Sequence, residues 1–382
     1  MNSDFHYYGT FVAACLAGYN QNDAKIIAYS AQFVDDCNKA LLRNLKNTNT
    51  KPIPTVHSLY ELFDYGSRIK MGKNCDSELR NVWMAFHFLP GNFGFIKNAY
   101  QGVETANKKY GSSNWQYDKS QEELFQAMCE PNSETVKAMI HATRSDDLHM
   151  IGVRMHVLAD TWAHQYYVGT PSWFINGRHN EVTPIDEQGR LGASFVYSLT
   201  QRTDNLSDGI FSGTSESDNS TAISYLGHGQ IGSVPDYACL HYNLRPQWNG
   251  DYVVEKNNTE DHFQAFKQMV YALTCFKNNN PSSFELFKYA DLGTKAETIK
   301  GILKTWDTDQ TKSWKKYLES LTGIKEIATY YHDAWTKANV SKELGFDVAP
   351  DPNYYRFQSA CIEHLKFVQD FVKSKGLSSI FN

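Results

Sequence analysis

The segment from Met155 to Gln165, with the sequence MHVLADTWAHQ, places His156, Asp160 and His164 at intervals of four residues. On an α-helix these three side chains lie on one stripe, each one turn from the next. Two imidazoles and a carboxylate form a ligand set that a borderline-soft divalent metal such as zinc accepts. The alternative is a buried pair of Asp160 and one histidine, with the other histidine at the surface. Three possible ligands in helical phase favour the metal site.

The residues around this stripe are typical of a buried helix, because Ile151, Met155, Leu158 and Trp162 form an apolar face beside it. Most of the chain has helical periodicity, and alternation with a period of two residues is scarce. The predicted helical ranges are 23–45, 57–70, 78–88, 120–129, 133–144, 147–168, 190–202, 260–277, 295–305, 311–338 and 355–375. We therefore expect an all-α fold, a large helical domain with a metal cleft between its helices.

Two glycine- and serine-containing stretches, 89–118 and 203–224, interrupt the helical pattern and predict long loops of the kind that often carry function. Histidines become rare after about residue 280. We expect residues 1–280 to form the metal-binding helical domain. Residues 281–382 are expected to form a helical region that packs on this domain, either as a separate unit or as part of one continuous domain.

The composition excludes several classes of protein. The 382 residues have a net charge of −5 and no basic stripe, which argues against stable nucleic-acid binding. The seven cysteines form no CxxC motif and predict neither a disulfide framework nor a cysteine zinc site. No apolar run is long enough to cross a membrane, and the polar N-terminus has no signal-peptide pattern. We expect a soluble protein, either cytoplasmic or exported by a specialised secretion system.

Further candidate ligands lie in the N-terminal part of the chain. His6 stands at the mouth of an apolar helix, where a lone histidine is usually a surface residue. Asp35 and Asp36 lie late in the range 23–45, and the alternative for them is a solvated acidic pair. His87 is enclosed by aromatic residues and followed by Pro-Gly, so it needs either a metal or a hydrogen-bonded partner in the core.

A last candidate pair follows the second long loop. His228 lies between two glycines, which allow the backbone to approach a ligand closely, and Asp236 follows at a turn. A plain glycine-rich turn is the alternative. The histidines at 57, 149, 179, 262, 332 and 364 have polar or charged neighbours and need no special role. The sequence has no nucleophile elbow, no P-loop and no dinucleotide fingerprint.

The order of these candidates, with the motifs DFHYYG, AQFVD, FHF, HVLAD and GHGQIGSVPD, resembles the superfamily of trinuclear-zinc phospholipases C and single-strand-specific zinc nucleases. Within it, the chain looks most like bacterial metallophospholipase C-like proteins. The resemblance covers roughly residues 4–240. It implies two or three zinc ions, with these ligands: His6, Asp35, His87, His156, Asp160, His164, His228 and Asp236. Asp4 and Asp36 are secondary candidates. Asp36 ranks below Asp35 because the AQFVD motif ends at Asp35.

The chain departs from the superfamily pattern at three places. The N-terminal tryptophan whose amine and carbonyl bind a metal is absent, so either Asp4 replaces it or one site is lost. Asp236 follows His228 by eight residues rather than four, which makes it the least certain ligand. The absence of a signal-peptide pattern also departs from the export that is usual in the superfamily.

The resemblance implies a zinc-dependent phosphodiesterase of phospholipase C type, in which a metal-activated water attacks a glycerophospholipid. Asp35 and Asp160 would bind metal or orient the water. Trp173 and Phe174 lie in an apolar loop that predicts transient contact with a membrane surface, or else fills a helix junction. A nuclease or small-phosphoester hydrolase is the alternative in the same class. A non-catalytic binding or effector protein with a structural metal is the alternative in another class.

Overall fold

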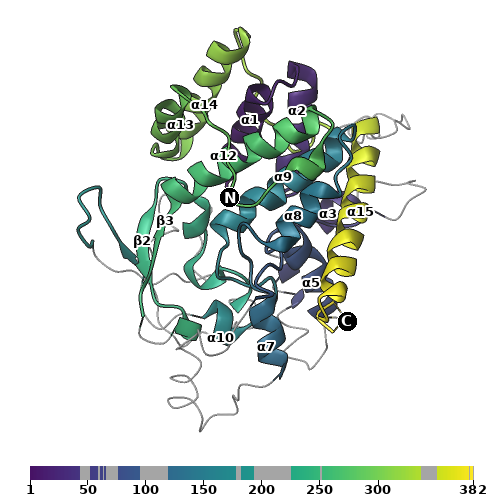
Figure 1. Ribbon diagram of the computed structural model, residues 1–382, viewed down its shortest axis with the longest axis vertical. Coiled ribbons are helices and arrows are strands. Elements are labelled where there is room, and N and C mark those ends of the chain that lie inside the picture. The colour runs from purple at the N-terminus through teal and green to yellow at the C-terminus, as the bar shows by residue number, and fades with distance from the viewer. Residues whose placement is uncertain are drawn as a thin grey trace.

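A computed structural model describes residues 1–43, 52–58, 61–62, 64–65, 76–94, 119–177, 182–192, 225–249, 252–336, 351–377 and 379–381. Helix α9 (Leu148–Ala163) runs through the middle of the molecule (Figure 1). Three long helices pack against it: α2 (Gln21–Phe33), α12 (Asn258–Lys277) and α15 (Pro352–Ser374). Because α9 is covered on several sides, nearly all its residues are buried, and its polar stripe is held inside the protein.

The other described helices surround this centre. They are the π-helical segment η1 (Asp4–Gly9) and helices α1 (Thr10–Leu16), α3 (Lys39–Arg43), α5 (Asp76–Phe86), α7 (Lys119–Gln126), α8 (Glu134–His141), α10 (Trp173–Asn176), α13 (Lys295–Leu303) and α14 (Asp307–Thr322). Four short 3₁₀ turns lie at η5 (Gly229–Ile231), η6 (Val234–Asp236), η7 (Gln247–Asn249) and η8 (Pro281–Ser283). None of the helices in the described ranges combines the length and apolar character that a bilayer crossing requires.

A small antiparallel sheet corrects the expectation of an all-α fold. Its strands are β1 (Thr183–Pro184), β2 (His241–Leu244) and β3 (Val254–Asn257), in the order β1-β2-β3. The fold is thus mostly helical with a three-stranded sheet at one side (Figure 1). Strands of two to four residues are too short for their alternation to stand out in a sequence.

Two predicted helices end more than ten residues earlier than expected, and α9 ends at Ala163, five residues before the end of the predicted range 147–168. The range 23–45 is interrupted after Phe33, so that Asp35 and Asp36 lie in a turn between α2 and α3. The range 311–338 ends at Gly323, whose φ of 73° is the left-handed conformation that terminates helices. Residues 95–118 and 193–224, which include both predicted loops in large part and most of the predicted helix 190–202, lie outside the described residues.

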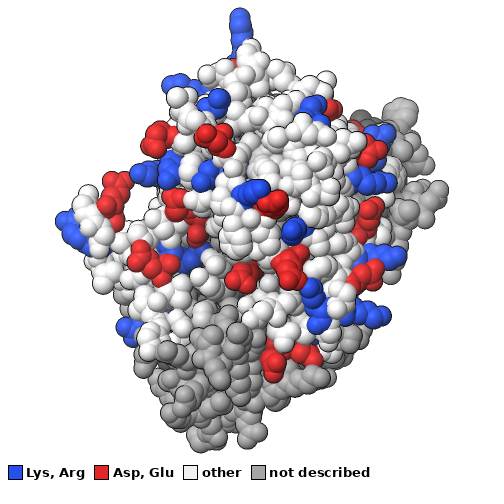
Figure 2. All heavy atoms as spheres, in the orientation of Figure 1, with Lys and Arg blue, Asp and Glu red and all other residues white. Residues whose placement is uncertain are grey.

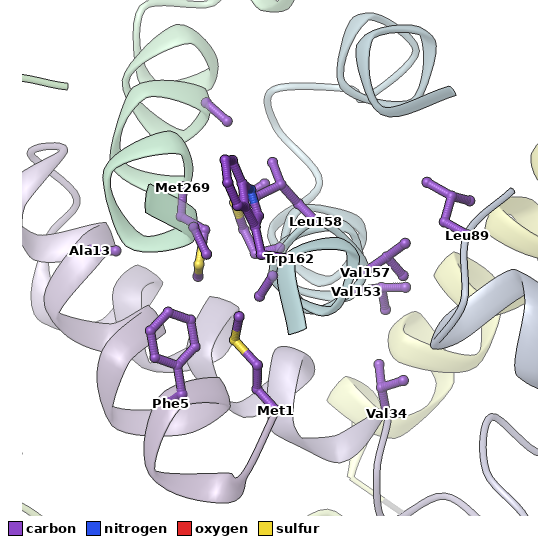
Figure 3. Close-up of a cluster of buried hydrophobic side chains, with 14 of the residues drawn as sticks. Met1, Phe5, Ala13, Val34, Leu89, Val153, Val157, Leu158, Trp162 and Met269 are labelled. Atoms are coloured by element: carbon purple, nitrogen blue, oxygen red, sulfur yellow. The ribbon is translucent and has the colours of Figure 1, made fainter. Parts of the chain in front are cut away.

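One hydrophobic core includes side chains from both sides of residue 280. Met1 and Phe5 lie beside α9 and α12, close to Trp162 and Met269 (Figure 3). The same cluster includes Trp314 of α14, together with buried residues of α13 and α15. The C-terminal region therefore shares its core with the helices that carry the polar stripe.

The close crossing of α2 and α9 depends on Gly152. A Cβ atom there would lie 2.4 Å from the carbonyl oxygen of Ile27 and 2.4 Å from the Cβ of Ser30. We expect Gly152→Ala to lower the free energy of unfolding by about 2 kcal/mol or more, because a backbone helix contact must open. Gly301→Ala is the control. It lies within α13 with no atom near its added Cβ, and it should raise stability by ~0.5–1 kcal/mol in chemical denaturation.

Candidate metal centre

The carboxylate of Asp160 lies at the middle of a buried cluster of histidines and acids. Asp160 is 1% exposed, and its Oδ2 atom is 3.2 Å from His156 Nε2 on the preceding turn of α9. His164 closes the C-terminal end of the helix, with Nδ1 3.6 Å from the same oxygen. The stripe expected from the sequence therefore forms, and it faces the interior of the protein.

Other candidate ligands reach Asp160 from distant segments. His6, on η1, places Nε2 3.1 Å from Asp160 Oδ1. His87, directly after α5, places Nδ1 3.3 Å from Asp160 Oδ2. Asp35 Oδ1, in the turn after α2, is 3.7 Å from His87 Nδ1 and 3.8 Å from His156 Nε2. The ring of His6 also stacks on that of His156, with centroids 3.9 Å apart.

His228 and Asp236 complete the cluster at the other end of the stripe. Asp236 Oδ1 is 3.0 Å from His164 Nε2, and its Oδ2 is 3.7 Å from His228 Nε2. A 3₁₀ turn at Val234–Asp236 brings the carboxylate back towards His228. The eight-residue spacing, unusual for the superfamily, is therefore compatible with a shared site.

The eight candidate ligands fall into three groups, each with ligand atoms within 4.8 Å of one another. The groups are His6, His156 and Asp160; Asp35, His87 and His156; and His164, His228 and Asp236. His156 belongs to two groups, and Asp160 lies beside members of all three. Each of these groups could hold a metal ion, and the mixture of imidazole and carboxylate donors suits zinc.

Three histidines are oriented by a hydrogen bond from one ring nitrogen to a backbone carbonyl, which leaves the other ring nitrogen for a metal. His87 Nε2 donates to the carbonyl of Thr55 (2.8 Å), and His164 Nδ1 donates to the carbonyl of His87 (2.7 Å). His228 Nδ1 donates to the carbonyl of Gly232 (2.5 Å). Such bonds fix the tautomer that turns the free nitrogen lone pair towards a metal, a usual feature of histidine ligands.

The electrostatics of the cluster also suit a cation. Burial and the neighbouring Asp160 raise the pKa of Asp35 well above its ordinary value. Burial lowers the pKa of His156 to about 4 and that of His228 to about 4, so that both imidazoles are neutral near pH 7. Neutral imidazoles and crowded carboxylates are the forms that bind a metal, and a divalent cation would offset the carboxylate charge.

Met1 provides a polar group that the sequence analysis missed. Its amino group lies 2.6 Å from Asp160 Oδ1 and 3.2 Å from Asp236 Oδ1. Burial lowers the pKa of this amino group, but the negative charges of these two carboxylates and of Asp35 outweigh burial and raise the pKa to about 11. The superfamily resemblance pointed to an N-terminal residue at this place, but the absence of tryptophan directed the prediction to Asp4. Asp4 instead accepts a hydrogen bond from Thr311 of α14 and belongs to none of the three groups.

Two further expectations are corrected. Asp36 turns away from the cluster, and its Oδ2 accepts hydrogen bonds from Tyr330 Oη (2.7 Å) and Gln32 Nε2 (3.3 Å). Phe174 is 1% exposed and packs edge-on against Phe125, so the prediction of membrane contact is wrong for this side chain, which fills a helix junction. The side chain of Trp173 lies outside the described residues.

Comparison with known proteins identifies a family but no activity. The model of DUF6765, a family of unknown function, matches residues 1–372. The chain belongs to this family. A search of curated proteins and of solved structures finds no similar protein. The matched range includes all eight candidate ligands and most of α15, so the family pattern extends beyond the part of the chain that carries the metal motifs.

Proposed function

We propose that this protein is a zinc-dependent phosphodiester hydrolase of phospholipase C type, which uses water to cleave glycerophospholipids. The observation that carries the proposal is the convergence of the three ligand groups, because two of them share His156 and Asp160 lies beside members of all three. Adjacent metal sites are suited to a phosphodiester, whose oxygens carry the charge that two or more metal ions can stabilise. A single structural metal would need only one of the three groups.

The residues of the proposed centre would have distinct roles. Zinc ions held here would polarise the phosphate oxygens and lower the pKa of a bound water. Asp160 would hold metal through either oxygen, because Oδ1 faces His6 and Oδ2 faces His87. Asp35 is the most exposed of the carboxylates, with 27% of its side chain accessible, and Asp236 and His228 are each 17% exposed. Asp35 would therefore be the carboxylate of the cluster that substrate and water reach most readily, and it would orient the attacking water.

The state of the nearby thiols also favours water as the nucleophile. Burial raises the pKa of Cys129 well above its ordinary value, and the charge of Asp160 adds to this shift. Burial likewise raises the pKa of Cys37 to about 12. Both thiols are protonated near pH 7, and the thiolate is the nucleophilic form. Covalent catalysis by either cysteine is therefore disfavoured.

The distribution of charge supports a phospholipid rather than a nucleic acid as the substrate. Lysine and arginine side chains are interspersed with aspartate and glutamate over the described part of the face in Figure 2. This mixture, with the net charge of −5, differs from the basic groove that tracks a polynucleotide backbone. The resemblance to phospholipases C favours the same choice.

The test begins with the zinc content of protein purified in metal-supplemented buffer. We expect two or three zinc ions per chain, and headgroup release from phosphatidylcholine or phosphatidylglycerol vesicles that stops when a chelator removes the metal. Less than one zinc per chain would contradict the catalytic proposal. Digestion of single-stranded DNA without headgroup release would instead assign the centre to a nuclease.

A further inference from the structure

The turn after α2 presents two adjacent carboxylates, of which only one enters the metal centre. Asp35 lies within reach of His87 and His156, whereas Asp36 is held by Tyr330 and Gln32. The Tyr330 hydroxyl makes the shorter of these two bonds to Asp36, 2.7 Å against 3.3 Å. Tyr330 belongs to the segment that follows α14, about three hundred residues further along the chain.

The position of the Tyr330 hydroxyl is fixed by packing against the N-terminal elements. Its ring centroid lies 5.1 Å from that of Tyr7 and 5.0 Å from that of Tyr29. Its backbone N–H donates to the Tyr8 hydroxyl (3.4 Å), and the Tyr29 hydroxyl donates to the carbonyl of Tyr331 (2.9 Å). The segment is therefore fastened to η1 and α2, which carry His6 and lead to Asp35.

We propose that Tyr330 is a positioning residue that holds Asp36 out of the metal centre, so that Asp35 alone of the two acids binds metal. The inference rests on the proposed metal centre and extends it to the C-terminal region. A partly buried carboxylate needs hydrogen-bond donors or a cation. Without the Tyr330 hydroxyl, the Asp36 carboxylate keeps, among the described residues, only the longer hydrogen bond from Gln32. It then turns towards the metal, where it competes with Asp35.

The first test compares two tyrosine variants that each lose one hydrogen-bonding hydroxyl, only one of which contacts Asp36. Tyr330→Phe keeps the ring packing and removes the bond to Asp36. Tyr271→Phe, the control, removes the hydrogen bond from α12 to the carbonyl of Ser283 (2.8 Å) and touches neither Asp36 nor the residues that pack on Tyr330. Zinc affinity is measured by competition with a chromophoric chelator, and the absorption spectrum of cobalt-substituted protein reports the ligand geometry. In Tyr330→Phe only, we expect the zinc site of lowest affinity to bind ~10–100-fold more weakly and the absorption spectrum of the cobalt-substituted protein to change.

A double-mutant cycle tests whether the effect passes through Asp36. Asp36→Asn alone should retain zinc, and adding Tyr330→Phe to it should have no further effect, because no competing carboxylate remains. Equal zinc affinity and spectra in Tyr330→Phe and Tyr271→Phe would overturn the inference, as would an undiminished loss in the Asp36→Asn background. Wild-type protein without zinc would instead overturn the proposed metal centre, so the two failures are distinguishable.

Discussion

Asp160→Asn is expected to abolish zinc binding at the shared part of the centre and to lower kcat/KM for the phosphodiester by about a thousandfold or more. That loss corresponds to ~4 kcal/mol of transition-state stabilisation. The reason is the central place of this carboxylate, whose two oxygens lie within 3.3 Å of His6, His87 and His156. The asparagine has the same shape but lacks the negative charge that two metal ions would share. Zinc content and vesicle hydrolysis are the measurements.

Asp147→Asn provides a matched control on the same helix. Asp147 caps the N-terminus of α9, where its carboxylate accepts from the backbone N–H of Met150 (3.0 Å). Asparagine caps helices about as well as aspartate, so this variant should keep its zinc, its activity and its circular dichroism. Both variants should retain the helical signal of the wild type. Full turnover in Asp160→Asn would show that the site is misplaced.

Acidification is expected to destabilise the fold, because His262 and His364 are buried as neutral imidazoles. Burial lowers the pKa of each to about 3; the Met1 amino group adds to the shift at His262, and Arg154 adds to it at His364. Between pH 6.5 and about 3 the unfolded chain binds a proton at each position and the folded chain does not. The free energy of unfolding therefore decreases as the pH is lowered through this range, by up to ~1.4 kcal/mol per pH unit for each histidine.

The contribution of one histidine is isolated by difference. His364 Nε2 donates to the carbonyl of Ala85 (2.9 Å), and the amide of His364→Gln can replace this bond without a titrating group. We expect the pH dependence of unfolding by urea to become shallower in this variant over pH 4–6. His332→Gln, at an exposed position, should leave it unchanged. If the free energy of unfolding depended on pH equally in wild type and His364→Gln, the assignment of this pH dependence to His364 would be refuted.

Several features of the centre were predictable because they are local in sequence. The spacing of His156, Asp160 and His164 determines one stripe whenever the segment is helical, and the apolar residues around it make it so. His87 and His228 were marked by their neighbours, aromatic residues in one case and glycines in the other. The order of the ligands, compared with a known superfamily, then predicted that they share one site.

Other features depend on contacts that no local pattern encodes. The histidines at 262 and 364 have ordinary neighbours in sequence, and only the packing of α12 and α15 against α9 buries them. The apolar Phe174 gave the same signal for a membrane loop and for a helix junction, and burial against Phe125 decided for the junction. The short strands β1–β3 were likewise too brief to predict.

The sequence by itself determined the ligand types, the stripe on α9 and a mostly helical fold, because helical periodicity and residue chemistry are properties of neighbouring residues. Only the tertiary structure decided that the Met1 amino group lies where Asp4 was expected, and that Asp35 faces the cluster while Asp36 faces Tyr330. These choices depend on distances between segments hundreds of residues apart, which the packing of the whole chain sets.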